Sequence, residues 1–440
     1  MPLTTLFPCR PAHAALLLVA PLLALLPTAA HSAGFQLRTG SPDWSANAFA
    51  GMAAKGYDAG TAWTNPAGMT LLDRSEIDTG LNAIFPSARF SGQDLIGPVP
   101  VPGSQGGNAA EFGLTPSLEG VWSYAPRLKF GLAVEAPFGL RTTYPADFVG
   151  RYQANVSSVS DIEIGLSAAF RINQHLSLGA GPIFDAFQTR LTNAINIGPV
   201  SALTGDPAID IHGSDWALGY HLGVLYEINP HVRLGLDYRS RINHQLSGAQ
   251  SIFVPPLLAR ASPATAALLA ARNTSATAKA TLPDILTLSY YADLSEEWSL
   301  MATAQWTHWS LLQQVTVVGA NGQTESLALK FRSTWFASVG ANYHPRWAPR
   351  LTLQAGTGFD RSPVDNTTRS PRIPARAGVP LGVGLTYAVL PNTSLQLAYL
   401  HEFYVRESGV DFSSTPSAGR IIGSYASHAD VVSVGAKMMF

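Results

Sequence analysis

The chain is poor in charge, in cysteine and in long apolar runs. Charged residues make up 13% of its 440 residues, compared with about 25% in an ordinary soluble domain. The formal net charge of −1 gives no reason to expect nucleic-acid binding. Beyond the amino-terminal region, no stretch reaches the ~18 apolar residues that a membrane-spanning helix needs. The one cysteine, Cys9, precedes the amino-terminal apolar run, so disulfides, thiol catalysis and cysteine–metal sites are excluded from the secreted chain.

Recognisable catalytic motifs are also missing. The sequence has no G-x-S-x-G, no P-loop and no H-E-x-x-H, because His401-Glu402 lacks the second histidine. The 11 histidines are scattered, without the spacing of metal ligands. We therefore expect no enzymatic activity, no metal and no cofactor.

The amino terminus has the features of a secretory signal. Arg10 supplies the only positive charge, residues 14–26 form an apolar run, and small residues follow at Ala30 and Ser32. This pattern predicts a signal peptide over residues 1–32, cleaved after Ser32 or alternatively after Ala30. The rest of the chain is expected outside the cytoplasm.

Short turns and long polar loops alternate along the remaining chain. Short turns on the periplasmic side and long loops outside are typical of antiparallel barrels in the bacterial outer membrane. Six turns and seven loops predict fourteen strands within residues 73–440, with both chain ends in the periplasm. The turns are at 125–126, 173–174, 229–230, 294–295, 344–345 and 391–392, and the loops are at about 86–111, 137–156, 192–213, 248–277, 312–331, 361–374 and 408–425.

Several segments between these turns alternate with a period of two. In segment 232–239, the apolar Val232, Leu234, Leu236 and Tyr238 alternate with Arg233, Gly235, Asp237 and Arg239. In a membrane barrel the apolar residues face outward, whereas a soluble sandwich would turn them inward. Closure is required because an unpaired strand edge in hydrocarbon would be too costly.

Aromatic residues precede each short turn, and an aromatic residue ends the chain. Amphipathic rings gather at the membrane–water boundary, so this placement indicates a periplasmic aromatic girdle. Ordinary enrichment of tyrosine in strands is the alternative. Phe440 closes the last alternating segment, which fits recognition by the barrel-assembly machinery. The aromatic residues are Tyr124, Phe170, Tyr226, Tyr290 or Tyr291, Tyr343 and Tyr387.

Residues 33–72 do not have the pattern of strands. The segment is rich in alanine and glycine, with one helix expected around 45–54. A fourteen-strand barrel leaves an open pore unless something fills it. We therefore expect this segment to fold into the lumen as a plug, or hatch.

At this point the chain resembles a known family. AGFQL at 33–37, DAG at 58–60 and NPAG at 65–68, followed by APFGL at 136–140 and SPVDNTTRSPRIP at 362–374, are similar to the FadL/TodX family. These are outer-membrane transporters of long-chain fatty acids and other hydrophobic compounds. The likeness extends along the whole mature chain.

The resemblance implies passive uptake in three steps. Apolar patches on the outer loops capture the ligand, an apolar pocket in the lumen holds it, and rearrangement of the hatch releases it sideways through the wall. Uptake of aromatic hydrocarbons by the same route is the alternative. Other possibilities are a general porin, a lipid hydrolase and a structural surface protein. Expected partners are the hydrophobic ligand, outer-membrane lipid and lipopolysaccharide.

Candidate ligand contacts lie in the hatch and in one apolar outer loop. Packing within the plug, or of the loop onto the barrel rim, is the competing explanation for these residues. The candidates are Phe35, Leu37, Trp44 and Phe49 in the hatch, and Ile252, Phe253, Val254, Leu257 and Leu258 in loop 248–277.

A ligand carboxylate would need a cationic partner in an apolar lumen. The resemblance implies the mature amino terminus and two basic positions for this role. Arg332 falls at one of them. The other carries Asn193, with Arg190 three residues earlier. This departure leaves a neutral ligand open.

Two proline motifs have expected structural roles. We expect Asn65, Pro66, Ala67 and Gly68 to form a turn rather than a ligand contact, with Asn65 capping its own backbone and Gly68 permitting positive φ. Pro137 removes a ladder donor from a strand. We take it as a marker of the opening in the wall, because relatives open near this strand.

Overall fold

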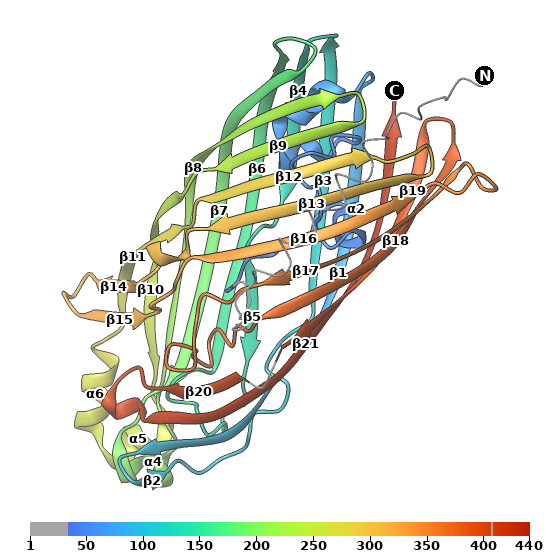
Figure 1. Cartoon of the computed structure of the whole chain (residues 1–440). Helices are drawn as coiled ribbons and strands as arrows, with labels where there is room; N and C mark the ends of the chain where they lie inside the picture. Colours follow the sequence, from blue (N-terminus) through green and yellow to red (C-terminus); the bar gives the residue numbers. More distant parts are fainter. Residues whose placement is uncertain (1–33, 406–407) are drawn as a thin grey trace, which may run out of the picture.

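The described part of the chain forms one closed barrel of fourteen antiparallel strands, as predicted (Figure 1). The computed structural model describes residues 34–405 and 408–440. The predicted signal peptide, residues 1–32, lies outside the described residues. β1 (Glu76–Ile96) pairs with β21 (Arg420–Met439) and closes the ring.

Some crossings of the wall are interrupted, and each of these carries two strand labels in Figure 1. The uninterrupted crossings are β1, β3 (Gly113–Ala125), β6 (Val156–Arg171), β7 (Leu176–Ala194), β8 (Ala208–Asn229), β17 (Leu351–Asp360), β18 (Gly378–Leu390), β19 (Thr393–Tyr404) and β21. The interrupted ones are β4 (Leu128–Glu135) with β5 (Gly139–Thr143), β9 (Val232–Arg239) with β10 (Ile242–Phe253), β11 (Thr274–Leu282) with β12 (Ile285–Asp293), β13 (Trp298–Thr307) with β14 (Gln314–Gly319), and β15 (Thr324–Ala328) with β16 (Thr334–Tyr343).

One end of the barrel carries short helices and two extra strands, opposite the end where the chain terminates (Figure 1). We call it the outer end, because the long loops lie there. Its elements are β2 (Val99–Pro100), η2 (Gly198–Val200), α4 (Ser201–Thr204), α5 (Pro256–Ala261), α6 (Pro263–Ala270), β20 (Ser408–Phe412) and η4 (Pro416–Ala418).

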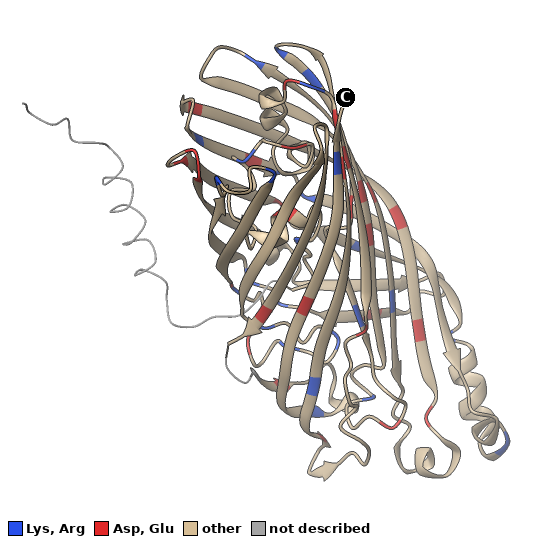
Figure 2. Ribbon diagram, turned by 90° about the vertical axis from the view of Figure 1, so that its right-hand side faces the viewer, with Lys and Arg blue, Asp and Glu red and all other residues tan. Residues whose placement is uncertain are grey.

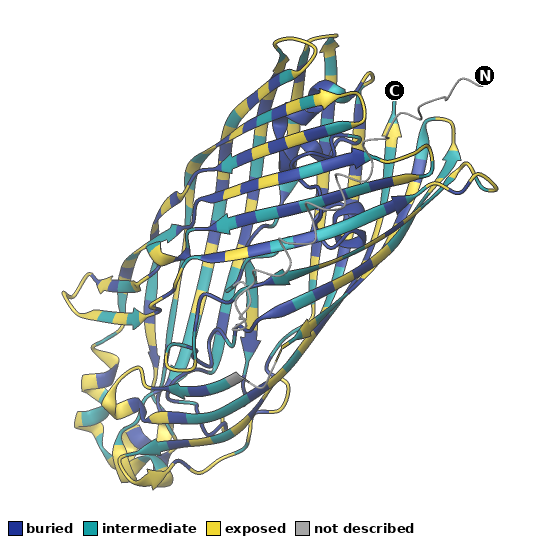
Figure 3. Ribbon diagram, in the orientation of Figure 1, coloured by how far each residue is buried: buried dark blue, intermediate teal, exposed yellow. Residues whose placement is uncertain are grey.

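The outer surface of the wall is apolar and its inner surface is polar. On β9, Leu234 and Leu236 are exposed whereas Arg233, Asp237 and Arg239 are buried, as the period of two predicts. The same alternation runs along the other strands (Figure 3), and charged residues are sparse along the ribbon (Figure 2). This arrangement suits a barrel whose outer face is in contact with lipid.

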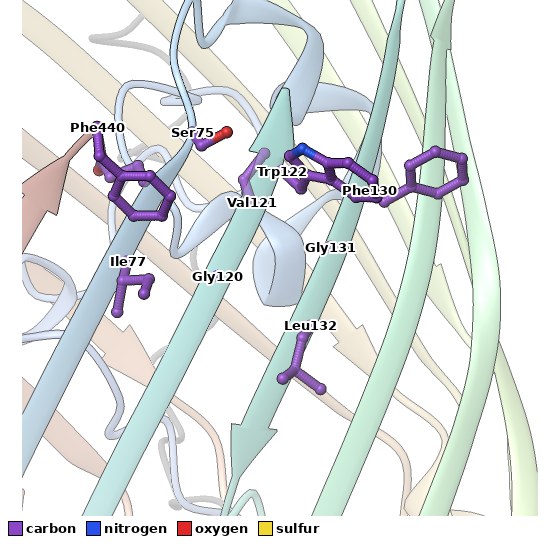
Figure 4. A pocket seen from close by; sticks show the side chains of 10 residues that line it. Ser75, Ile77, Gly120, Val121, Trp122, Phe130, Gly131, Leu132 and Phe440 are labelled. Atoms are coloured by element: carbon purple, nitrogen blue, oxygen red, sulfur yellow. The ribbon is translucent and has the colours of Figure 1, made fainter. Parts of the chain in front are cut away.

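Aromatic rings gather at the end where the chain terminates. Trp122, Phe130 and Phe440 border a shallow apolar groove of about 310 Å³ on the outer face of β1, β3 and β4 (Figure 4). Of the rings expected in the girdle, Tyr124, Phe170, Tyr226 and Tyr387 are exposed. Tyr291 is buried and packs against Tyr57, with ring centroids 6.3 Å apart.

The strands on the outer side are longer than the sequence pattern predicts. β1 continues to Ile96, within the expected loop 86–111, and its pairing with β21 extends to Leu95–Arg420. A strand of about 9–11 residues suffices to span the bilayer. The ladder therefore continues beyond the membrane and raises the outer rim. Burial still alternates along this part of β1, but the exposed side chains are now the polar Arg89, Ser91 and Gln93, whereas Ala88 and Phe90 are buried.

Residues 34–72, which we call the inner segment, lie inside the barrel (Figure 1). The segment contains α2 (Pro42–Ala46), α3 (Thr61–Thr64) and the 3₁₀-helix η1 (Pro66–Leu71), and nearly all of its side chains are buried. No helix of the described residues has the length and apolar character needed to span a membrane.

The helix expected around residues 45–54 is wrong in position. α2 ends at Ala46, and Ala48, Phe49 and Gly51 have φ values of 46°, 64° and 74°. These left-handed conformations cannot continue a right-handed helix. The chain instead winds through turns that fit it against the wall.

Glycines in the wall let the inner segment approach the strands closely. A Cβ at Gly235 of β9 would lie 1.8 Å from the carbonyl oxygen of Ala53, and one at Gly356 of β17 would lie 2.0 Å from that of Asn47. Strand residues with side chains would not leave room for this backbone-to-backbone contact.

Replacing Gly235 by valine should therefore displace the inner segment and open the lumen. We expect the ionic current through planar bilayers to rise above that of the unaltered protein. Gly165→Val is the control, because a Cβ there meets nothing within 4 Å. Equal currents for Gly235→Val and the unaltered protein would show that the segment does not block the bore.

Candidate functional site

An apolar cluster occupies the lumen on the outer side of the inner segment. At its centre, the ring of Phe35 lies 4.9 Å from Trp309, 5.7 Å from Phe138 and 6.5 Å from Phe331, measured between centroids. Leu37 lies against Gly139 of β5. The cluster, which we call the lumen cluster, consists of Phe35, Phe138, Ile183, Phe187, Ile242, Leu246, Leu282, Ile285, Trp309, Leu312, Leu329, Phe331, Val364, Ile373 and Ala375.

The wall beside this cluster is interrupted between β4 and β5. The pairing of β3 with β4 ends at Leu118–Val134, so residues 113–117 of β3 have no partner in β4 or β5. The inner segment pairs with the interruption instead. The N–H of Leu37 donates to the carbonyl of Pro137 (2.7 Å), and the N–H of Gly139 donates to the carbonyl of Phe35 (2.9 Å).

The inner segment is also tied to the opposite side of the barrel. Arg38 forms an ion pair of 2.6 Å with Asp360 of β17, and both side chains are buried. The guanidinium lies 4.2 Å from the centroid of the Phe336 ring. The first residues of the segment thus bridge the lumen from the interrupted wall to β17. The role of Pro137 as a marker of the opening remains a prediction.

The Asn65–Gly68 motif fixes the inner segment to the wall. The Asn65 side chain donates to the carbonyls of Ala53 (2.6 Å) and Val224 (3.0 Å), and accepts from the N–H of Ala67 (3.0 Å). The prediction that Gly68 has a positive φ is wrong, because this residue lies within η1 and does not have a left-handed conformation. A Cβ there would lie 2.1 Å from Thr61 Oγ1, so close packing explains the glycine.

Trp44 and Phe49 lie deeper in the barrel, in a second cluster. Phe49 packs on Phe336 of β16, with ring centroids 6.1 Å apart, and Trp44 lies against Gly40 and Gly60. Neither belongs to the lumen cluster. Their contact with a ligand remains a prediction.

Both arginines selected from the sequence form ion pairs with carboxylates at exposed positions. Arg332 pairs with Asp365, and Arg190 pairs with Asp210 at 2.6 Å; the two arginine side chains are 59% and 57% exposed. Side chains alternate along a strand, so Arg190 faces away from the side on which Leu191 and Asn193 lie. A ligand role for these arginines remains a prediction.

A different arginine reaches Asn193. Arg372, in the loop between β17 and β18, donates from Nη2 to Asn193 Oδ1 (2.7 Å) and from Nη1 to the Thr192 carbonyl (3.2 Å). The side chain is only 7% exposed, and its hydrogen-bond partners among the described residues are neutral groups. Burial lowers the pKa of Arg372 to about 10, so the guanidinium stays charged at neutral pH.

Arg372 lines a cavity of about 300 Å³ at the outer end. The other charged groups in its lining, Arg272 and Glu325, pair with each other. Val315 and Leu327 line the cavity and also pack against the lumen cluster. The cavity, which we call the outer cavity, therefore lies next to the lumen cluster. Its apolar lining includes Leu191, Ile209, Ile211, Val315, Val317 and Leu327.

The apolar loop at 248–277 divides into buried and exposed residues. Ile252 and Leu258 are buried and pack with Ile209 and Leu269, and Val254 is partly buried against them. Phe253 and Leu257 are 63% and 58% exposed. Of the five residues predicted to capture a ligand, Phe253 and Leu257 are therefore the ones that can meet it from the outside without rearrangement of the loop.

The comparisons with known proteins agree with this architecture. A family model described as "Outer membrane protein transport protein (OMPP1/FadL/TodX)" matches residues 23–440. The chain belongs to this family. It is therefore an outer-membrane protein, as its apolar outer surface indicates.

Relatives within the family include transporters of two kinds of compound. A "Long-chain fatty acid transport protein" of Escherichia coli O6:H1 is 28% identical, over 86% of this chain and 89% of its own. The crystal structure of a Pseudomonas aeruginosa FadL homologue matches with a TM-score of 0.85 and 24% identity, over 92% of this chain and 99% of its own. That of the Ralstonia pickettii toluene transporter TbuX matches with a TM-score of 0.66 and 18% identity, over the same shares.

Asn65→Ala should loosen the inner segment without unfolding the barrel. The substitution leaves the carbonyls of Ala53 and Val224 without these donors, at a cost of roughly 1–3 kcal/mol. We expect faster hydrogen exchange of amides in residues 47–72, with unchanged exchange in the barrel strands. Exchange rates equal to those of the unaltered protein would contradict this role of Asn65.

Proposed function

We propose that this protein takes up long-chain fatty acids, or similar amphiphiles, passively across the outer membrane. The observation that carries the proposal is the buried Arg372 in the lining of a cavity that also has apolar walls. Such a site offers a cation to a carboxylate and apolar walls to its alkyl chain. Transport, rather than catalysis, is the proposed activity.

The apolar walls provide the driving force for binding. Each methylene buried contributes about 0.8 kcal/mol, so an alkyl chain gains several kcal/mol even after ordering costs. A water-filled pore would give no such gain. This difference favours the proposed uptake over a general porin.

The described contacts support a route through the protein. The exposed Phe253 and Leu257 would meet the ligand first, as the capture surface expected from the sequence. The outer cavity would hold it, with its carboxylate at Arg372 and its chain toward Phe35. Separation of residues 35–37 from the interrupted wall would then open a path sideways between β3 and β5.

A neutral aromatic ligand is the second candidate. Asn193 stands where the resemblance implies a basic residue, and a toluene transporter shares the fold. Arg372 weighs against this candidate, because a buried charge is costly beside a ligand that cannot pair with it. Binding of oleate and of toluene to the purified protein distinguishes the two candidate ligands.

Further partners are proposed on the same basis. The apolar outer face would contact outer-membrane lipid, with lipopolysaccharide around the raised rim. The exposed Phe440 at the end of β21 would be recognised by the barrel-assembly machinery.

Arg372→Met should weaken binding of a fatty acid and spare a neutral analogue. A hydrogen bond to a charged group contributes about 1.5–3 kcal/mol, so we expect oleate to bind roughly ten- to a hundredfold more weakly. Oleyl alcohol should bind with unchanged affinity. Binding is measured by displacement of a fluorescent fatty acid from the purified protein in detergent.

The matched control is Arg420→Met, which removes an exposed arginine that already pairs with Asp411. It should leave oleate binding unchanged. Binding of toluene but not oleate by the unaltered protein would favour the aromatic candidate, and binding of neither would end the proposal.

A disulfide between the inner segment and the interrupted wall should block uptake. Gln36 and Phe138 face each other in an antiparallel bridge without hydrogen bonds between them. Such pairs have Cα atoms about 4.5 Å apart, which suits a disulfide. Oleate uptake by cells producing Gln36→Cys/Phe138→Cys should fall under oxidising conditions and recover with reductant.

The two single cysteine variants are the controls, because neither can form the bond. The secreted chain contributes no other cysteine. Full uptake by the oxidised double variant, with the disulfide verified by mass spectrometry, would show that release does not use this part of the wall.

A further inference from the structure

Three carboxylates from β6 and β7 converge inside the barrel. Asp161, Glu163 and Asp185 each offer an oxygen, and these atoms all lie within 4.8 Å of one another. The three residues are 2%, 3% and 0% exposed. Glu163 pairs with Arg239 of β9. As carboxylates, Asp161 and Asp185 have no hydrogen-bond partner for either oxygen among the described residues, so a proton or a cation is needed to compensate their charge.

A buried histidine on another strand lies beside Asp185, at the edge of this group. His244 of β10 is 1% exposed, and neither ring nitrogen has a hydrogen-bond partner among the residues that the structure describes. Its Nε2 lies 3.5 Å from Asp185 Oδ1, and its Nδ1 lies 3.4 Å from Asp215 Oδ2. The Phe187 ring stacks on the imidazole with centroids 5.1 Å apart and holds its orientation.

We propose that Asp161, Glu163, Asp185 and His244 bind a divalent metal ion of the first transition row, such as Zn²⁺. Oxygen and imidazole ligands together favour such an ion over Mg²⁺ or Ca²⁺. Two ligands at ~2.1 Å from a tetrahedral ion lie about 3.4 Å apart, close to the observed separation of His244 and Asp185. Asp215 on the other ring nitrogen completes the carboxylate–histidine–metal arrangement of known sites.

The charges of the site agree with a divalent ion. The three carboxylates carry three negative charges, and Arg239 returns one positive charge. Two negative charges remain to be neutralised. His244 is then required as a neutral ligand, which leaves its Nδ1–H free to donate toward Asp215.

The ion would also act on the inner segment through one intermediate residue. The Arg239 guanidinium lies 3.5 Å from the centroid of the Trp63 ring and donates to the Trp63 carbonyl (3.3 Å). An ion that fixes Glu163 therefore fixes the arginine that holds α3. The metal site does not include Arg372 or the outer cavity, although Phe187, which stacks on His244, belongs to the lumen cluster. Binding of Zn²⁺ to the protein without fatty acid therefore tests the metal site apart from the proposed ligand.

Titration of the purified full-length protein with Zn²⁺, after treatment with a chelator, tests the site. Isothermal titration calorimetry should show one tightly bound equivalent. Asp185→Asn and Asp161→Asn keep the side-chain size and should each weaken it on the order of 10–100-fold. Co²⁺ bound in place of Zn²⁺ should give visible ligand-field bands that both variants lose. Barrel folding of each variant is verified by its heat-dependent migration on gels.

His428→Gln is the control for binding elsewhere. His401 and His428 stack 6.1 Å apart, and His401 lies 2.7 Å from Asp430, so this pair offers Zn²⁺ a second place to bind. The tight equivalent should survive in His428→Gln. Absence of Zn²⁺ binding to the unaltered protein, as expected if Asp161 and Asp185 share a proton instead, would overturn the proposal. So would equal binding by folded Asp185→Asn.

Discussion

The structure depends on the requirement that every backbone N–H and C=O in hydrocarbon has a hydrogen-bond partner. An unpaired group there costs several kcal/mol, so the first strand of the barrel must form hydrogen bonds with the last. β1 and β21 meet this requirement over twenty paired residues. Closure in turn encloses a wide lumen, in which the inner segment lies.

Filling the lumen imposes opposite demands on the wall. Where the inner segment approaches closely, as at Gly235 and Gly356, the strands carry no side chain. Elsewhere the inner face carries charged residues that contact the segment, such as Arg239 over Trp63 and Asp360 with Arg38. Toward the outer end the lining becomes apolar around Phe35. The glycine contacts, the charged contacts and the apolar lining all lie on the inner face of the wall. They are compatible with one outer surface because every second residue of a strand faces inward and can differ without changing the lipid-facing residues.

The sequence predicts the wall well and the site only in part. Period-two alternation and turns depend on residues close together in the sequence. The number of strands and the outward face of β9 are therefore predicted correctly. Phe35 was expected inside the barrel because it belongs to the predicted plug, and the structure places it in the lumen cluster. The partner of Asn193 could not be found, because Arg372 lies 179 residues further along the chain. Asn193, at a position where the resemblance implies a basic residue, was the one signal in the sequence that pointed to this part of the barrel.

Local conformation explains the remaining differences. The left-handed φ values of Ala48 and Phe49 are imposed by packing against the wall and oppose their usual preference. The exposed ion pairs of Arg190 and Arg332 depend on which way each side chain points. For Arg190 a one-residue change of register would reverse that direction.

The short bridge between residues 35–37 and the interrupted wall has an energetic consequence. Two backbone hydrogen bonds hold it, together with the contact between the Phe35 and Phe138 rings. Each hydrogen bond has a net worth of about 0.5–1.5 kcal/mol. Pro137 has no backbone N–H, so it leaves no unsatisfied donor when these hydrogen bonds break. Separation of residues 35–37 from the wall would therefore disrupt far fewer hydrogen bonds than opening the ladder between β1 and β21, which pairs twenty residues.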